Sequence, residues 1–119
     1  MNKHPLVSII TPTLNAEKYL VYFFECLNRQ TYPKSKIEVV VADGGSTDKT
    51  IKIAKKYKAV VVDNPYIMAQ PGVYVGMKAA KGELLMVLPG DNIFKKNNAI
   101  DKIAGVFRDK TIYAAFPKH

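Results

Sequence analysis

The stretch Val39–Thr50, "VVVADGGSTDKT", joins a continuously apolar run to two glycines and a group of small hydroxyl and acidic residues. A continuously apolar run is typical of a strand that is covered on both faces of its sheet. The glycines permit a sharp turn, Ser46 or Thr47 can cap a following helix, and Asp48 suits the first turn of that helix. Asp43 closes the strand and is not needed as a cap. It could accept an N–H from a nucleotide base, or it could belong to a plain turn.

The same alternation of strand and helix patterns continues along the chain. Strands are expected at residues 6–10, 37–42, 59–62, 83–88 and 111–116, and helices at 16–30, 47–57, 71–80 and 97–107. Such an alternation implies right-handed crossovers and a mostly parallel sheet, which gives an α/β fold with three α/β/α layers. The 119 residues fit one compact domain, 1–119.

Composition narrows the classes of partner. The net charge of +8 suits phosphorylated ligands, anionic lipid headgroups or nucleic acid. Nucleic-acid binding would be better supported by arginines interleaved with aromatics, and the chain has only Arg29 and Arg108, so we expect no nucleic-acid partner. No apolar run reaches the roughly 20 residues that cross a bilayer, and the first residues lack the apolar region of a signal peptide. We expect a cytoplasmic protein, and leave peripheral association with the membrane surface open. Cys26, the only cysteine, is expected to be a buried thiol.

Three polar loops follow the first, second and fourth expected strands: "TPTLN" at 11–15, "DGGSTD" at 43–48 and "PGDN" at 89–92. Ligands of parallel α/β sheets bind beyond the carboxyl ends of the strands, where these loops meet. Asp91 is well placed to hold a metal or a phosphate, although Pro-Gly-Asp-Asn is also nearly ideal for a plain turn. Glu17 has a simple alternative role as a first-turn acid. The glycine-rich fingerprints of dinucleotide-binding proteins and of P-loop proteins are missing.

Three segments, taken in order, resemble the N-terminal, donor-binding half of a family 2 glycosyltransferase with the Rossmann-like GT-A fold. They are "PLVSIITPTLNAEKYL", "CLNRQTYPKSKIEVVVADGGSTDKT" and "GMKAAKGELLMVL". Members of the family transfer a sugar from a nucleotide diphosphate donor, such as a UDP- or GDP-sugar, to an acceptor hydroxyl. The chain is most similar to the inverting enzymes of this kind, and its acceptor could be a carbohydrate, a lipid or a protein. The acceptor-binding half would lie outside this chain.

The resemblance implies a set of residues that bind the donor nucleotide, namely Pro12, Thr13, Leu14, Glu17, Asp43, Gly76 and Asp91. Within this set Asp43 would contact the base, and Gly76 opens the family's G-x-x-x-A-x-G-E segment beneath the donor. Asp91 would match the last acid of the Asp-x-Asp motif. There it would hold a divalent cation, Mg²⁺ or Mn²⁺, between the two phosphates of the donor, and this cation would stabilise the departing nucleoside diphosphate.

Departures from the family pattern leave a second function possible for this chain. Leu14 stands where an aromatic residue usually stacks on the base, and Val73 and Tyr74 replace a common Arg-Asn pair. Pro89 replaces the first acid of Asp-x-Asp, and a single carboxylate binds Mg²⁺ or Mn²⁺ less firmly than two. No catalytic base is identified.

The alternative function is a non-catalytic nucleotide-sugar-binding or scaffold module with a degenerate metal motif, which could work as a homo-oligomer or with a partner subunit. A nucleotidyltransferase would need a first loop rich in glycine and arginine, which "TPTLNAEKY" is not.

Overall fold

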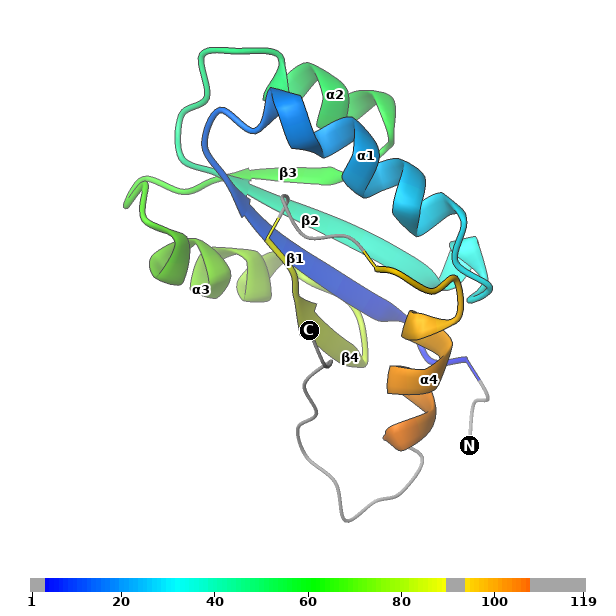
Figure 1. Ribbon diagram of the computed structural model, residues 1–119. Helices are drawn as coiled ribbons and strands as arrows, with labels where there is room; N and C mark the ends of the chain where they lie inside the picture. Colours follow the sequence, from blue (N-terminus) through cyan, green and yellow to red (C-terminus); the bar gives the residue numbers. More distant parts are fainter. Residues whose placement is uncertain (1–3, 90–93, 108–119) are drawn as a thin grey trace.

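A computed structural model describes residues 4–89 and 94–107 of the chain, which form an α/β fold around one parallel sheet (Figure 1). The strands are β1 (Val7–Thr13), β2 (Ile37–Asp43), β3 (Val60–Asp63) and β4 (Leu84–Val87). They lie in the order β3-β2-β1-β4, and all three neighbouring pairs are parallel. The expected mostly parallel sheet is therefore confirmed.

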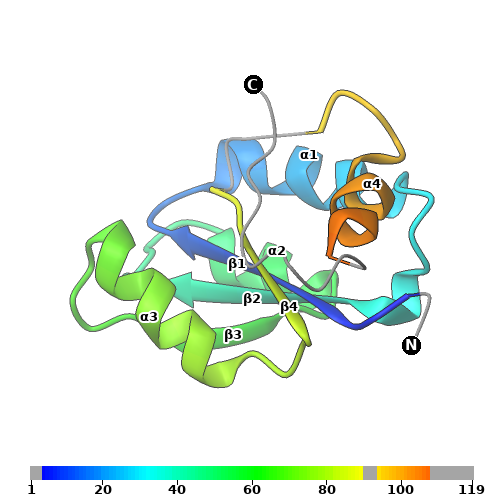
Figure 2. The ribbon, with the colours of Figure 1, turned by 90° about the horizontal axis from the view of Figure 1, so that it is seen from below.

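Four α-helices connect and cover the strands: α1 (Glu17–Asn28), α2 (Thr50–Lys56), α3 (Ala69–Ala79) and α4 (Ala99–Val106). A short 3-10 turn, η1 (Lys34–Lys36), precedes β2. Helices α1 and α2 lie on one face of the sheet and α3 lies on the other (Figure 1). Helix α4 lies on the same side as α1, as the view in Figure 2 shows. These are the three layers that the sequence predicted.

Side chains alternate between the two faces of β1. Val7 and Ile9 are fully buried in the core cluster beneath α1, α2 and α4, together with Phe23 and Ile100. Ile10 faces α3, where the backbone of the helix approaches the sheet closely. Cys26 is buried, and its Sγ contacts the carbonyl oxygen of Phe94 at 3.3 Å. The expectation of a buried thiol is confirmed.

Most element boundaries differ from the sequence prediction by one to three residues. Helix α2 begins at Thr50, three residues later than expected, because the residues before it bond to another loop. Helix α3 begins at Ala69 and contains Pro71 in its first turn, where a missing backbone N–H costs little. Strand β1 continues beyond Ile10 to Thr13. The strand expected at 111–116 lies outside the described residues. Among those residues, no helix has the length and hydrophobicity that a bilayer span requires.

Candidate functional site

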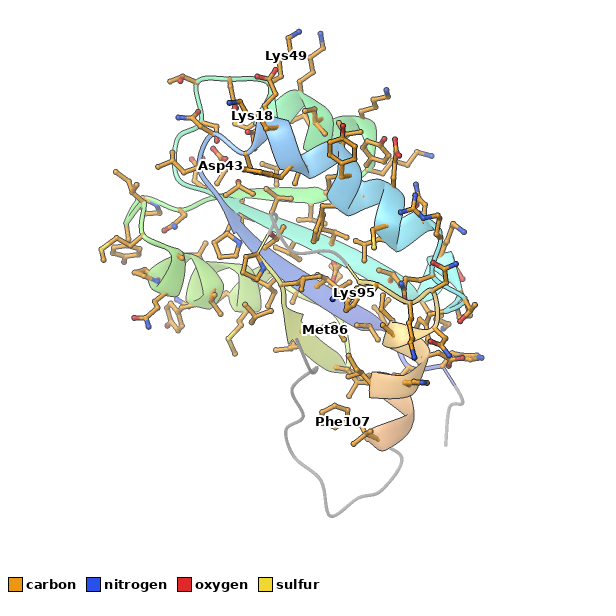
Figure 3. The ribbon with its side chains drawn as sticks, in the orientation of Figure 1. Lys18, Asp43, Lys49, Met86, Lys95 and Phe107 are labelled. Carbon is orange, nitrogen blue, oxygen red and sulfur yellow. The ribbon has the colours of Figure 1, made fainter. Side chains whose placement is uncertain are left out.

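The order of the strands locates the site. β1 pairs with β2 along its whole length, from Val7 to Thr13, but its pairing with β4 ends at Ile10. β2 and β3 follow β1 on one side of it, by way of α1 and α2, whereas β4 is added on its other side by way of α3 on the opposite face. The strand order therefore reverses at β1, and the carboxyl ends of β1 and β4 form a topological switch point, where ligands of open α/β sheets bind. The register also sets Thr13 beside Asp43. Figure 3 shows Asp43 at this edge, next to the loops that follow β1 and β2.

Asp43 is only 3% exposed and accepts four hydrogen bonds. Its Oδ1 accepts the hydroxyls of Thr13, at 2.7 Å, and of Ser46, at 2.5 Å. Its Oδ2 accepts the amides of Gly45, at 3.0 Å, and of Ser46, at 2.8 Å. An ionised carboxylate offers about four lone-pair positions, and all of them are occupied here. In this structure Asp43 therefore organises the loop that follows it.

These bonds also keep Asp43 ionised. Burial alone would raise the pKa of its carboxyl group, but the hydrogen bonds from Ser46, Thr13 and Gly45 outweigh burial and lower that pKa below its ordinary value. Hydrogen bonds to the charged form of an acid have this effect because protonation would disrupt them. The site thus contains a buried negative charge at neutral pH.

The loop after β2 supplies acceptors for the start of α1. Three consecutive amides, those of Asn15, Ala16 and Glu17, donate in this order to Ser46 Oγ at 2.8 Å, Thr50 Oγ1 at 2.8 Å and Asp48 Oδ2 at 3.1 Å. The first amides of a helix have no acceptor within the helix, so they need one from elsewhere. Here Ser46, Asp48 and Thr50, some thirty positions further along the chain, provide the acceptors. These hydrogen bonds join the loop after β1 to the loop after β2.

Asn15 both donates a hydrogen bond to the loop after β2 and accepts one from it. Its side-chain oxygen accepts the amide of Thr47 at 2.8 Å, so each loop both donates to the other and accepts from it. Asn15 has a φ of 52°, in the left-handed region that asparagine tolerates better than most residues. This conformation turns the chain from β1 into α1.

The roles expected for Ser46, Thr47 and Asp48 at the start of α2 are corrected by these contacts. None of the three lies in the helix, and the residue at its N-cap, Lys49, makes no side-chain capping bond. Asp48 precedes the helix and accepts the Thr50 amide, at 2.9 Å, while its other oxygen accepts the amide of Glu17. The hydrogen bond from the Thr50 hydroxyl is the main reason that the pKa of Asp48 is lowered.

Each of the two glycines of the loop is required for a different structural reason. Gly45 has a φ of +105°, which L-amino acids rarely adopt. A Cβ at Gly44 would lie 3.0 Å from the carbonyl oxygen of Ile67, so the backbones of two loops touch there. The expectation that these glycines allow a sharp turn and a close backbone approach is confirmed.

Other members of the predicted site lie around this centre. Leu14 is 49% exposed at the tip of the loop after β1. Pro12 faces α3, where a Cβ at Gly72 would come within 3.2 Å of it. Glu17 begins α1 and is the acid of its first turn, which agrees with the alternative role expected from the sequence. The contacts of these residues with a donor stay a prediction.

Packing accounts for the glycines of the 76–83 segment. A Cβ at Gly76 would lie 2.5 Å from Cγ2 of Ile10, so only glycine lets α3 lie this close to β1. A Cβ at Gly82 would lie 2.5 Å from Ser8 Oγ, which accepts the Gly82 amide at 2.7 Å. Gly76 therefore positions α3 beneath the site, and its direct contact with a donor stays a prediction.

The metal-binding part of the prediction falls on residues that are not described. Asp91 lies outside the described residues, whereas Pro89 is exposed just after Leu88, whose amide donates to the Ile10 carbonyl at 3.0 Å. Within 4–89 and 94–107, no three His, Cys, Asp or Glu side chains come together as metal ligands. The binding of a divalent cation at Asp91 stays a prediction.

Sequence reasoning missed Asn64, which is 2% exposed at the end of β3. Its amide donates to the Asp43 carbonyl at 2.8 Å, and its side-chain nitrogen donates to the Met68 carbonyl at 2.9 Å. Asn64 thereby fixes the loop between β3 and α3 against the strand that carries Asp43. The available signal was the Asn-Pro pair after an apolar run, which favours a turn.

Comparison with known proteins agrees with this geometry. The family model described as "Glycosyl transferase family 2" matches residues 8–119. The poly(ribitol-phosphate) beta-N-acetylglucosaminyltransferase TarS of Staphylococcus aureus is 35% identical over 103 residues, which are 82% of this chain and 18% of TarS. Glycosyltransferase AglE of Haloferax volcanii is 37% identical over 94 residues, which are 73% of this chain and 31% of AglE. The chain thus spans less than a third of either relative.

Solved structures show the same fold. The S. aureus TarS structure in complex with UDP-GlcNAc superposes with a TM-score of 0.71 at 33% identity, over 87% of this chain and 31% of that one. The mannosyltransferase PcManGT of Pyrobaculum calidifontis, in complex with GDP-Man and Mn²⁺, superposes with a TM-score of 0.83 at 23% identity. This second match covers 92% of this chain and 34% of PcManGT, and at its level of identity it speaks for the fold alone.

Proposed function

Because the chain belongs to glycosyl transferase family 2, we propose that it is the donor-binding half of an inverting glycosyltransferase, which moves a sugar from a UDP- or GDP-sugar to an acceptor hydroxyl. Support for a uridine donor comes from TarS, which is 33% identical in the structure that contains UDP-GlcNAc. No residue of this chain is proposed as the general base, and the acceptor is not assigned.

The observation that carries the proposal is the ionised Asp43 at the end of β2, beside the switch point and buried among four donors. An ionised carboxylate at this edge can accept the ring N–H of a uracil or guanine base. For that, the Ser46 hydroxyl would turn away from Oδ1 and keep its bond from the Asn15 amide. The exposed Leu14 would then cover one face of the base.

Residues Pro12, Thr13, Glu17 and Gly76 act around this contact in the proposal. Thr13 holds the Asp43 carboxylate in place through its hydroxyl, and Pro12 and Gly76 set the distance between β1 and α3. Glu17 places a negative charge at the start of α1, where the helix dipole favours it. In this arrangement the donor's base lies over the ends of β1 and β2, and its phosphates extend toward the end of β4.

We further propose that Asp91 binds a divalent cation together with the phosphates of the donor. Mg²⁺ and Mn²⁺ accept such mixed sets of carboxylate, phosphate and water ligands. When bound, the cation would neutralise charge on the leaving nucleoside diphosphate. Pro89→Asp restores the missing first acid and should lower the Mn²⁺ concentration that half-saturates the nucleotide complex. Unchanged Mn²⁺ affinity in this variant would contradict a metal at Asp91.

Thermal unfolding tests the proposal directly. UDP and GDP are added to the chain, with and without Mn²⁺, up to millimolar concentration, and the melting temperature is followed. A ligand at 100 times its Kd stabilises the folded state by about 2.7 kcal/mol, which raises the melting temperature measurably. We expect a rise for the wild type and no rise for Asp43→Asn, because its side chain has one acceptor oxygen instead of two and its NH2 group cannot accept the N–H of a base.

Asp63→Asn is the matched control, since Asp63 pairs with Asp43 in the β2–β3 register but is exposed. It should respond to nucleotide as the wild type does. If no nucleotide raises the melting temperature of the wild type, the donor site is refuted.

The second candidate function, a binding module without catalysis, is favoured by the exposed proline at position 89. If UDP binds but the protein that carries the acceptor-binding half turns over no UDP-sugar, this second function is correct.

A further inference from the structure

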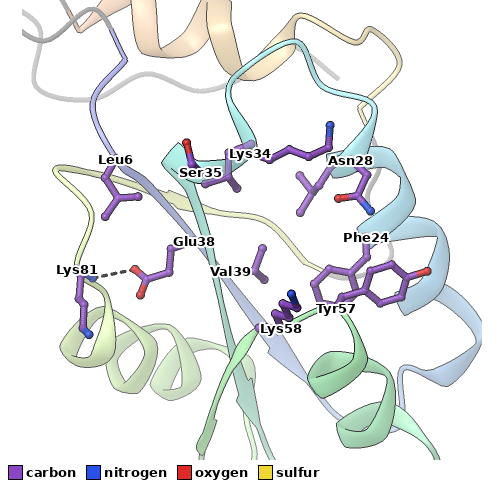
Figure 4. A pocket seen from close by; sticks show the side chains of 13 residues that line it. Leu6, Phe24, Asn28, Lys34, Ser35, Glu38, Val39, Tyr57, Lys58 and Lys81 are labelled. Carbon is purple, nitrogen blue, oxygen red and sulfur yellow. Dashed lines mark hydrogen bonds between the residues drawn. The ribbon is translucent and has the colours of Figure 1, made fainter.

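A hollow of about 570 Å³ lies at the opposite edge of the sheet from the site described above (Figure 4). Its walls come from the amino ends of β1, β2 and β3, from the last turn of α1, from the end of α2 and from η1. The volume falls in the range of about 300–1,000 Å³ that is usual for small-molecule sites. β2 separates this edge from Asp43 by seven residues, which corresponds to roughly 20 Å.

One side of the hollow is apolar. Phe24 and Tyr57 line it as a stacked pair, with ring centroids 4.8 Å apart and an angle of 6° between the rings. Leu6, Leu27 and Val39 continue this wall toward the strands. Such a surface favours an alkyl chain or another flat apolar group, because burial of apolar surface is the main driving force available there.

Three lysines from three different segments stand around the same hollow. Lys34 belongs to η1, Lys58 follows α2 and Lys81 follows α3 (Figure 4). All three are exposed, and none forms an ion pair with an acid of the described residues, whose single pair joins His4 and Asp101.

The one acid in the lining is already engaged. Glu38 accepts the Ser8 hydroxyl at 2.5 Å and the Lys81 amide at 2.9 Å with the same oxygen, Oε2. The charge around the hollow is therefore positive on balance and faces an apolar wall.

We propose that this hollow binds a single-chain anionic amphiphile, with its alkyl chain along the Phe24–Tyr57 wall and its phosphate or carboxylate head at the positive rim to which Lys34, Lys58 and Lys81 contribute. The apolar wall complements the alkyl chain of such a molecule, and the unpaired lysines complement its anionic head. The ligand is distinct from a sugar donor, because it binds at the amino ends of the strands. The inference therefore holds independently of the proposed function.

A reporter in the lining tests the proposal. The chain contains no tryptophan, and Asn28 is an exposed residue at the rim of the hollow, so Asn28→Trp provides a single fluorophore. Decyl phosphate is titrated below its critical micelle concentration, in parallel with decanol. We expect a saturable blue shift of the emission with both, and tighter binding of decyl phosphate. A response that does not saturate, or equal affinities for the two probes, would overturn the proposal.

Charge variants show whether these particular lysines recognise the head. In the Asn28→Trp background, Lys34→Gln/Lys58→Gln/Lys81→Gln should bind decyl phosphate about tenfold more weakly, since three exposed ion pairs each contribute a small amount. Binding of decanol should not change. The matched control, Lys49→Gln/Lys52→Gln/Lys55→Gln, removes the same charge from α2 and the turn before it, away from the hollow, and should leave both affinities unchanged. An equal loss in both triple variants would refute the site.

Vesicles separate a single amphiphile from a membrane surface. Vesicles of anionic phosphatidylglycerol and of neutral phosphatidylcholine are added to the wild type and to both triple variants. We expect decyl phosphate to bind in the hollow whether or not the vesicles bind to the protein. If only the anionic vesicles bind, the control triple variant loses that binding, and decyl phosphate gives no saturable shift, then the lysines of α2 face a membrane and the proposed cavity ligand is wrong.

Discussion

The amide of Glu17, at the start of α1, donates to the carboxylate of Asp48, in the loop after β2, at 3.1 Å, although 31 positions separate the two residues. The first helix thus takes its N-terminal acceptor from the second strand–helix unit. The amides of Asn15 and Ala16 do the same with Ser46 and Thr50. The two loops that carry most of the proposed donor site therefore form one rigid piece.

Thr50 offers the sharpest test of this connection, because its side chain is fully buried and its hydroxyl accepts the Ala16 amide at 2.8 Å. Thr50→Val keeps the shape and removes the hydroxyl, which leaves a part-buried amide without an acceptor. We expect a loss of about 1–3 kcal/mol in the free energy of unfolding, measured by urea denaturation. Thr50→Ser keeps the hydroxyl and should lose only the contribution of one methyl group, about 0.8 kcal/mol. Equal costs for the two variants would show that the hydroxyl is irrelevant.

Acid unfolding should reveal the buried charge of Asp43. Its pKa lies below the ordinary value of 3.8, so the fold stabilises the ionised form. That contribution is fully present above the ordinary pKa and is lost as the pH falls through the lowered one. Between about pH 5 and pH 2, the free energy of unfolding of the wild type should therefore fall more steeply than that of Asp43→Asn.

Thr13→Val, which removes one of the four donors to Asp43, should reduce the acid slope by a smaller amount. Chemical denaturation at a series of pH values measures both slopes. Parallel curves for the wild type and Asp43→Asn would contradict the hydrogen-bonding pattern described for this carboxylate.

Gly76→Ala sets two effects against each other. Alanine is favoured over glycine inside a helix by about 1 kcal/mol. The new Cβ would however lie 2.5 Å from Cγ2 of Ile10, a buried atom on the central strand. We expect overpacking to prevail and to cost about 1–3 kcal/mol.

A double-mutant cycle with Ile10→Ala isolates this contact, because Ile10→Ala removes the obstructing methyl group. The cost of Gly76→Ala should shrink or change sign in the Ile10→Ala background. Strict additivity of the two changes would mean that the helix adjusts without strain.

Leu14→Tyr tests the position of the base. Leu14 is 49% exposed at the tip of its loop, and stacking of a base on an aromatic ring is worth about 1–3 kcal/mol. Titration calorimetry should show about tenfold tighter binding of UDP to this variant. Leu85→Tyr, at a leucine that is 45% exposed on β4, is the control and should leave UDP affinity unchanged. A similar gain in both variants would point to nonspecific stacking.

The sequence was sufficient for the order of the elements, because apolar periodicity is a local property. The nearly continuous apolar run before Asp43 predicted β2. The helical spacing of Tyr19, Leu20, Phe23, Phe24 and Leu27 predicted α1, although Tyr19 is 52% exposed. These features depend only on residues close to each other in the chain. The positions of "TPTLN" and "DGGSTD" directly after their strands likewise indicated that both loops lie at one edge of the sheet, which is the edge of the proposed site.

The contacts within the site could not be read in this way. Ser46 and Asp48 have the composition of a local helix start, and only the fold shows that their side chains reach Asn15 and Glu17. The same holds for Gly76, where glycine is required because a methyl group of Ile10, on β1, lies against the helix. Polar residues after a strand satisfy whichever backbone amides the tertiary structure brings near, and local pattern does not specify these.

The shared caps of α1 have a consequence for the order of folding. A chain segment that ends before β2 contains the whole of α1 but none of the three side chains that accept its first amides. That helix can fray at its N-terminus until Ser46, Asp48 and Thr50 arrive. During synthesis, the loop with Leu14 therefore takes its final shape only after Thr50 has been added, so the two sides of the proposed base pocket form together.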